Sequence, residues 1–109
     1  MGCEPQDILV VMVTAPNQEE AAKIADHAVR PRHAACATTI PMAGSTYWWE
    51  GQVVSEQETV LFLKTTVERF PLLQDTIQKV HSYKVPEIIA IPVSIGLPQY
   101  LEWVRREAS

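Results

Sequence analysis

The chain has 109 residues, of which 47% are hydrophobic and 20% are charged, and its formal net charge at pH 7 is −4. These values predict a single globular domain over residues 1–109 and exclude a disordered chain, and the negative charge argues against a nucleic-acid surface, which needs clustered Lys and Arg. No apolar run approaches the roughly 20 residues that span a bilayer, and the N-terminus lacks a signal-peptide pattern, so we expect a cytoplasmic protein without a membrane partner.

The first two elements in chain order are a buried strand and a capped helix. Ile8 to Val13 is an unbroken apolar run, which is typical of a strand covered on both faces. Asn17 and Glu20 have the spacing of a capping box, with Asn17 as the N-cap of a helix and Glu20 at its third position. The helix has one apolar face, and Pro31 ends it.

Two long strands follow. His33 to Tyr47 predicts the first, with a bend or bulge near Pro41 and Gly44. Trp48 to Gly51 is expected to form the turn, and Gln52 to Lys64 the second strand. That second strand should span roughly 43 Å at about 3.3 Å per residue, whereas a compact domain of this size is about 34 Å across. The hairpin should therefore extend beyond the core of its own domain.

An overhanging hairpin predicts self-association. A two-stranded ribbon is marginally stable alone, and its open edges invite aggregation unless they are covered. Trp48 and Trp49 stand near its tip, and an exposed aromatic pair usually marks an interface. The alternative is that both indole rings fold back over their own sheet. Copies of the same chain can cover the ribbon by symmetry, so we expect a homo-oligomer.

The last elements complete an α+β pattern. A second helix is expected to begin at Thr65 or Thr66, with Pro71 in its first turn. Ile88 to Val93 follows as an edge strand, because its proline cannot donate to a neighbouring strand. Leu97 to Arg106 is a short closing helix. The order predicts a ferredoxin-like βαββαβ fold, an antiparallel sheet with an extra C-terminal helix.

Ionisable side chains gather between the second helix and the last strand, from His81 to Glu87. Pro86 favours an extended conformation at Val85, which places Glu87 at the mouth of the strand. Imidazole and carboxylate suit copper or zinc, so Glu87 and His81 are the candidate metal ligands. Two alternatives remain open: a histidine at the end of a helix is often a favourable partner of the helix dipole, and Glu87 can instead form a structural ion pair with Lys64.

We expect these groups to line a ligand cleft between subunits. Besides Glu87, the cleft residues are Lys64, Tyr83, Trp49, Glu50 and Cys36. Cys36 lies in an alanine-rich run and is expected to be a buried small hydrophobe. On a strand it would face away from His33, and no Ser-His-Asp spacing, phosphate loop or close carboxylate pair occurs, so an enzyme is not expected. The other cysteine, Cys3, falls in residues 1–6, which are expected to form a flexible tail.

Several short motifs occur along the chain in a fixed order. They are Val13-Thr14-Ala15-Pro16, Ala34-Ala35-Cys36, Tyr47-Trp48-Trp49-Glu50-Gly51, Lys64-Thr65, the segment from His81 through Glu87, and Tyr100-Leu101 with Trp103. In this order and spacing they resemble the CutA family, which is named for divalent-cation tolerance. The resemblance covers nearly the whole chain, from about Ile8 to Arg105.

The resemblance implies a tight homotrimer, similar to the nitrogen-regulatory PII proteins, in which strands pair across subunits. It also implies a cytoplasmic protein with a role in the response to metal ions such as copper, and no established reaction. Some members carry a copper-binding Cys and a His where this chain has Val13 and Val80. Of that copper set Glu87 alone remains, so a PII-like scaffold or signalling trimer without a physiological metal site is the alternative.

Overall fold

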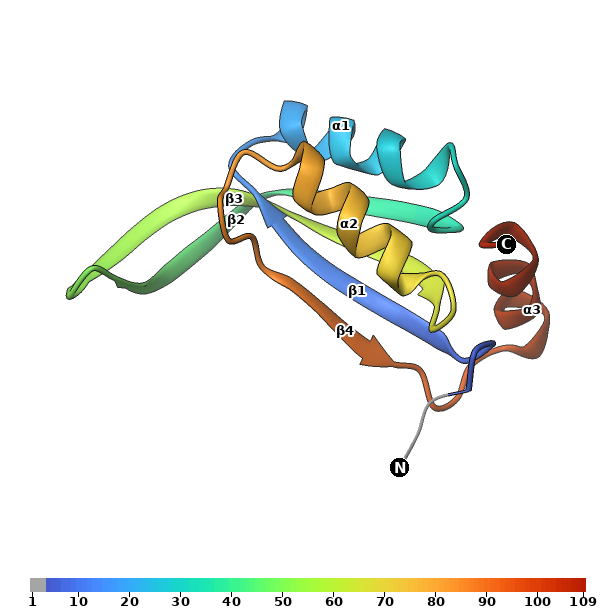
Figure 1. The fold of residues 1–109 in the computed structure, drawn as a ribbon. Coiled ribbons are helices and arrows are strands. Elements are labelled where there is room, and N and C mark those ends of the chain that lie inside the picture. Colours follow the sequence, from blue (N-terminus) through green and yellow to red (C-terminus); the bar gives the residue numbers. More distant parts are fainter. Residues whose placement is uncertain (1–3) are drawn as a thin grey trace.

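The computed structural model describes residues 4–109. Cys3, which was predicted to lie in a flexible tail, is outside the described residues. The elements follow the predicted order and form an α+β fold with one antiparallel sheet of strand order β2-β3-β1-β4. This is the ferredoxin-like arrangement expected from the sequence (Figure 1). The elements are β1 (Ile8–Ala15), α1 (Gln18–Val29), β2 (Cys36–Trp49), β3 (Gln52–Thr66), α2 (Phe70–Val80), β4 (Ile88–Pro92) and α3 (Pro98–Glu107).

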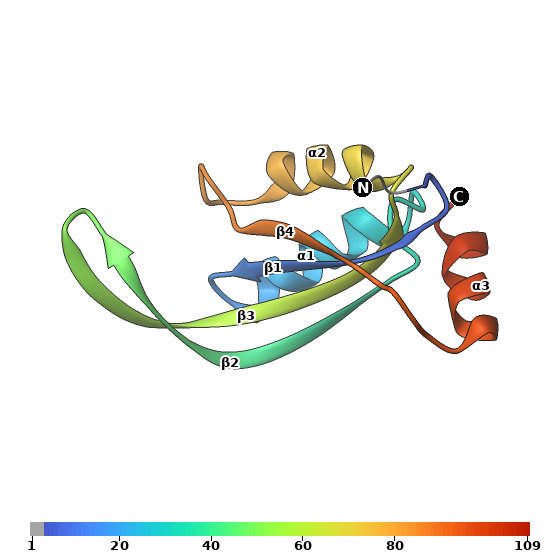
Figure 2. The same cartoon turned by 90° about the horizontal axis from the view of Figure 1, so that it is seen from below.

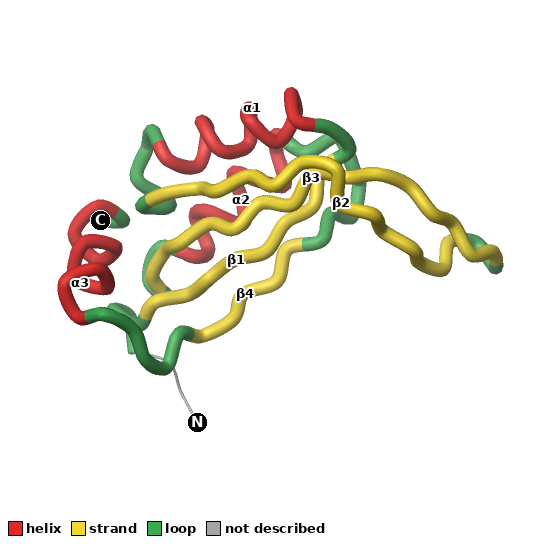
Figure 3. The backbone as a smooth tube through the Cα atoms, turned by 180° about the vertical axis from the view of Figure 1, so that it is seen from behind, coloured by secondary structure: helices red, strands yellow, loops and turns green. Residues whose placement is uncertain are grey.

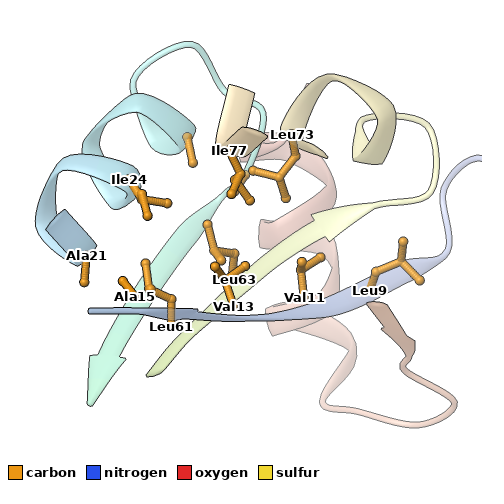
Figure 4. Close-up of a cluster of buried hydrophobic side chains, with 12 residues drawn as sticks. Leu9, Val11, Val13, Ala15, Ala21, Ile24, Leu61, Leu63, Leu73 and Ile77 are labelled. Atoms are coloured by element: carbon orange, nitrogen blue, oxygen red, sulfur yellow. The ribbon is translucent and has the colours of Figure 1, made fainter. Parts of the chain in front are cut away.

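The main core lies between the sheet and the helices α1 and α2. Alternate residues of β1 and β3 point toward the helices, and each helix packs a face of small and branched apolar side chains against them (Figure 4). Asn17 begins α1 as predicted, since its Oδ1 accepts the backbone N–H of Glu20 at 2.8 Å. The buried core residues include Leu9, Val11, Val13, Ala15, Ala21, Ile24, Leu61, Leu63, Leu73 and Ile77.

The other face of the sheet is open. Figure 3 shows the four strands in front of α1 and α2, and α3 covers this side only at the end where Ile8 is buried against it. Ile89 and Ile91 of β4 are 49% and 48% exposed there, in register with Met12 and Val10 of β1. The prediction that the first strand is covered on both faces holds in a single copy only at Ile8, which α3 buries, whereas Val10 and Met12 on the same face are half-buried.

The distal halves of β2 and β3, residues 43–58, form an arm that projects from the domain (Figures 1 and 2). The molecule measures 43 × 30 × 23 Å, which confirms the predicted overhang. A bulge between Ile40 and Ala43, where Met42 has a φ of 61°, separates the arm from the body and confirms the predicted irregularity. Trp48 and Trp49 are 74% and 63% exposed, so the alternative in which they fold back over their own sheet is wrong.

The arm ends in a two-residue turn. Trp49 pairs with Gln52, which leaves Glu50 and Gly51 as the turn, shorter than the predicted Trp48 to Gly51. Their φ values of 48° and 79° are both positive, as a type I′ hairpin turn requires. Gly51 suits this conformation, whereas a residue with a Cβ such as Glu50 adopts it at some cost.

Two other predicted boundaries differ from the structure. β2 begins at Cys36 rather than His33, because the N–H groups of His33 and Ala34 both donate to Ala28 O and close the end of α1. Helix α2 begins at Phe70 rather than at Thr65 or Thr66, which continue β3 as partners of β1. The predicted positions of Pro71 in the first turn of α2 and of β4 at a sheet edge are confirmed.

Helix α3 packs at the end of the sheet opposite the arm (Figure 2). Val104 and Ala108 of this helix are buried against Ile8 and Ala35 and form a second, small core. The Arg105 guanidinium donates to the carbonyl of Gln6 at 2.9 Å, which holds the chain before β1 against this helix. Among residues 4–109, no helix is long and apolar enough to cross a membrane.

Candidate functional site

His81 ends α2 and anchors the segment that follows it. Its side chain is fully buried, and both ring nitrogens have partners inside the chain. The backbone N–H of Tyr83 donates to Nδ1 at 3.0 Å, so Nδ1 acts as an acceptor and Nε2 carries the proton that is donated to Thr14 O at 2.7 Å. This neutral imidazole holds the end of α2 against β1, and in one copy neither nitrogen is free to bind a metal.

Glu20 fixes the same segment from α1. Its Oε2 accepts the backbone N–H of Ser82 at 3.0 Å and the Ser82 hydroxyl at 2.9 Å, and lies 3.3 Å from His81 Nδ1. The sequence assigned Glu20 to a capping box, but its carboxylate instead supports the segment 62 residues further along the chain. No local spacing could reveal this role, because only the packing of α1 beside α2 brings the two segments together.

Two tyrosines donate to two carboxylates of β3, one at the base of the arm and one along it. The Tyr83 hydroxyl donates to Glu58 Oε2 at 3.0 Å, and the Tyr47 hydroxyl donates to Glu56 Oε1 at 2.6 Å. Burial, followed by the bond to Glu58, raises the pKa of Tyr83 well above its usual value. The bond to Glu56 is the main cause that raises the pKa of Tyr47 to about 12. Glu58 is only 8% exposed, whereas the Tyr47–Glu56 pair is open to solvent.

Glu87 and Lys64 lie apart in one copy. Glu87 directly precedes β4 and is exposed, as predicted for a residue at the mouth of the strand. Lys64 pairs with Val10, whereas Ile88 pairs with Val13, so the two charges are roughly 10 Å or more apart along the sheet and two strands apart across it. The predicted Lys64–Glu87 ion pair is therefore absent within the chain, and Lys64 Nζ donates instead to Thr38 Oγ1 at 3.3 Å.

Cys36 lies on the open face of the sheet, directly opposite Lys64 in the β2–β3 register. It is half-buried rather than fully buried as predicted, and Tyr100 of α3 lies against it. Its Sγ lies 3.7 Å from the Tyr100 hydroxyl, whose pKa is raised by burial and by the contact with the thiol. His33 is not on the strand and bonds to Thr76 Oγ1 at 3.0 Å, so His33 and Cys36 form no pair.

The candidate residues thus occupy three separate places in one copy. The segment from His81 to Glu87 lies at the arm end of β4, Lys64 and Cys36 lie near α3, and Trp49 with Glu50 forms the tip of the arm. Residues 4–109 contain no group of three or more His, Cys, Asp or Glu side chains that could hold a metal ion. A groove of about 520 Å³ beside β2 includes Cys36 but is lined mainly by small apolar residues of α1 and β2.

Comparison with known proteins identifies the relatives of this chain. The family model described as CutA1 divalent ion tolerance protein matches residues 9–107. A divalent-cation tolerance protein CutA from Thermus thermophilus is 44% identical over 88% of this chain and 93% of the relative. Protein CutA from Homo sapiens is 39% identical over 96% of this chain, which spans 59% of the length of that relative.

Solved structures agree with the sequence comparison. A divalent cation tolerance protein from Thermus thermophilus superimposes with a TM-score of 0.91 at 41% identity, covering 94% of this chain and 99% of the other. CutA from Xylella fastidiosa gives a TM-score of 0.92 at 37% identity, with 94% and 99% of the two chains covered. The fold therefore has experimentally determined counterparts.

Proposed function

Since this chain belongs to the CutA1 divalent ion tolerance family, we propose that it acts as a homotrimer in the tolerance of divalent metal ions such as copper. In this proposal a metal ion, copper or zinc, or another small ligand binds in the clefts between subunits. The proposal includes a cytoplasmic location and no catalytic step. Both features rest on the sequence.

The observation that carries the proposal is the unprotected surface of one copy. The arm exposes Trp48 and Trp49, and the open face of the sheet exposes Ile89 and Ile91. The sheet also has two free edges, β2 and β4. Pairing of β4 of one copy with β2 of the next, repeated head to tail, covers both edges and closes into a ring. Three copies are the number implied by the family resemblance.

Subunit contacts would also complete the cleft. Glu87 is exposed and free of ion pairs among the described residues, so its carboxylate is available to a ligand. Trp49, Glu50 and Lys64 are too far away to join it within one copy. Assembly can bring these groups from a neighbouring copy toward the segment that carries Tyr83 and Glu87.

A scaffold or signalling trimer of PII-like type, without a physiological metal site, is the second candidate. Two observations favour it: both nitrogens of His81 are used inside the chain, and the remaining members of the copper set are replaced by Val13 and Val80. In this case the polar groups at the cleft stabilise the assembly and bind no metal.

Two measurements test the proposal. Light scattering at micromolar concentration should give a mass of three chains of 12.2 kDa each, and a stable single-chain species would contradict the assembly. Calorimetric titration of Cu(II) and of Zn(II) should show binding that the Glu87→Ala variant loses. Glu19→Ala, an exposed carboxylate of α1, is the control and should leave binding unchanged. Equal, weak binding by all three proteins together with a trimeric mass would support the scaffold.

A further inference from the structure

Lys64 and Glu87 are opposite charges at opposite ends of the open sheet face. Lys64 stands in a row with Val10 of β1 and Ile91 of β4 near α3. Glu87 precedes β4 at the arm end, where the alternation that exposes Ile89 and Ile91 extends to it. Neither charge has an ion-pair partner within 4.0 Å in the part of the chain that the structure describes.

Because of its surroundings, Lys64 would be destabilising without a carboxylate partner once another copy covers this face of the sheet. The lysine is half-buried, and its ammonium group donates a hydrogen bond to the neutral hydroxyl of Thr38. Its neighbours in the row, Val10 and Ile91, are apolar. A second copy that packs on this face would remove water from the ammonium group, and a charge without a partner is strongly disfavoured in such a place.

We infer that Glu87 of a neighbouring copy neutralises Lys64 when the open faces come together. This inference rests on the proposed assembly and names the contact at its cleft. In the contact that we infer, the Lys64 end of one copy lies against the Glu87 end of the next, which is possible because a head-to-tail contact joins two different parts of the surface. Each cleft of a closed ring then contains one such pair, contributed by two different copies, and the site is incomplete in a single chain.

The segment that carries Glu87 is held in a way that fits this role. The segment before it is fixed by His81 and Glu20 on one side and by the Tyr83–Glu58 bond on the other. The carboxylate is therefore held at the edge of the sheet on an ordered segment, which lowers the entropic cost of forming the pair. Complementary charge of this kind also selects the register in which two copies meet.

The test is a charge swap followed by sedimentation velocity over a dilution series. We expect Lys64→Glu and Glu87→Lys each to weaken assembly about thirtyfold or more, since each places like charges together in a desolvated contact. The double variant, K64E with E87K, should restore most of the loss because every contact again contains opposite charges. Lys23→Glu on the exposed side of α1 changes the net charge equally and should leave assembly unchanged.

The outcomes separate this inference from the proposed function. A monomeric wild type at all concentrations would overturn both. Wild-type trimers that tolerate both single reversals, or single losses that the swap fails to restore, would overturn the pairing and leave the trimer intact. Circular dichroism of each variant shows whether the fold is retained, and restoration by the double variant cannot be explained by a folding defect.

Discussion

The two bonds from tyrosine hydroxyls to carboxylates of β3 allow a direct test of whether burial or distance sets the strength of a hydrogen bond in this protein. Tyr83→Phe removes the hydroxyl that donates to Glu58 and keeps the ring, which lies 4.7 Å from the ring of His81. Tyr47→Phe removes the same group from Glu56, where the bond is shorter at 2.6 Å but exposed. The pair of variants therefore differs mainly in the burial of the acceptor.

The expected cost follows from the surroundings of each carboxylate. Glu58 is 8% exposed and loses its hydroxyl donor in Tyr83→Phe, so the variant should lose about 2 kcal/mol of unfolding free energy, in the range for hydrogen bonds to charged groups. For a domain of this size that corresponds to a fall in Tm of about 8 °C. Water replaces the lost donor at Glu56, so Tyr47→Phe should change Tm little.

Thermal unfolding of both variants and of the wild type measures this difference. All three proteins are compared at one concentration, because assembly makes Tm depend on concentration. A loss in Tyr47→Phe that equals or exceeds the loss in Tyr83→Phe would refute the reasoning, since the shorter bond would then contribute more despite its exposure. Glu58→Gln serves as a control, because the amide oxygen still accepts from Tyr83 and should reduce stability less than Tyr83→Phe.

Three further predictions concern the turn, the first helix and alkaline pH. Gly51→Ala should lower the free energy of unfolding in urea by about 1 kcal/mol, because φ is 79° there. Gly44→Ala is the control and should cost clearly less, because a Cβ added at this position would meet nothing within 4 Å; equal losses of unfolding free energy would contradict the turn assignment. Asn17→Ala should also lose about 1 kcal/mol, since it removes the acceptor of the first turn of α1, and an unchanged urea midpoint would show that the cap contributes nothing. The free energy of unfolding should fall above pH 10, because Tyr47 and Tyr83 have raised pKa values in the folded state, whereas in the unfolded chain their hydroxyls lose protons near pH 10. Absorbance titration of the folded protein should show both phenols ionising well above pH 10, and ionisation near pH 10 would contradict this.

The sequence predicted those parts of the fold that depend on local pattern. The N-cap at Asn17, the bulge after Ile40 and the edge position of β4 follow from side chains within a few residues, and the structure confirms them. The start of α2 was wrong because Thr65 and Thr66 suit a helix cap and a strand equally well. Pairing with β1 decides between the two, and that contact joins residues far apart in sequence.

The side chains that hold the candidate site in place were harder to predict, because they too lie far from their partners in sequence. Glu20 and Glu58 both hold the segment from His81 to Glu87, but they lie 62 and 25 residues from their partners Ser82 and Tyr83. Their sequence context shows a helix start and a polar strand, which are ordinary surface patterns. Their roles follow from the topology, in which α1 lies beside α2 and β3 continues past the end of β1.

The division between satisfied and unsatisfied polar groups indicates how the site works. His81, Ser82 and Tyr83 have partners inside the chain, so they position the segment and are poorly placed to bind a ligand directly. Glu87 and Lys64 have no ion-pair partner among residues 4–109, and both lie toward the surface that one copy leaves open. Groups that folding leaves without partners are the ones available to assembly or to a ligand. The two proposals for this protein therefore concern the same residues, and a variant of Glu87 that alters metal binding should also be measured for its effect on assembly before the site is assigned to either.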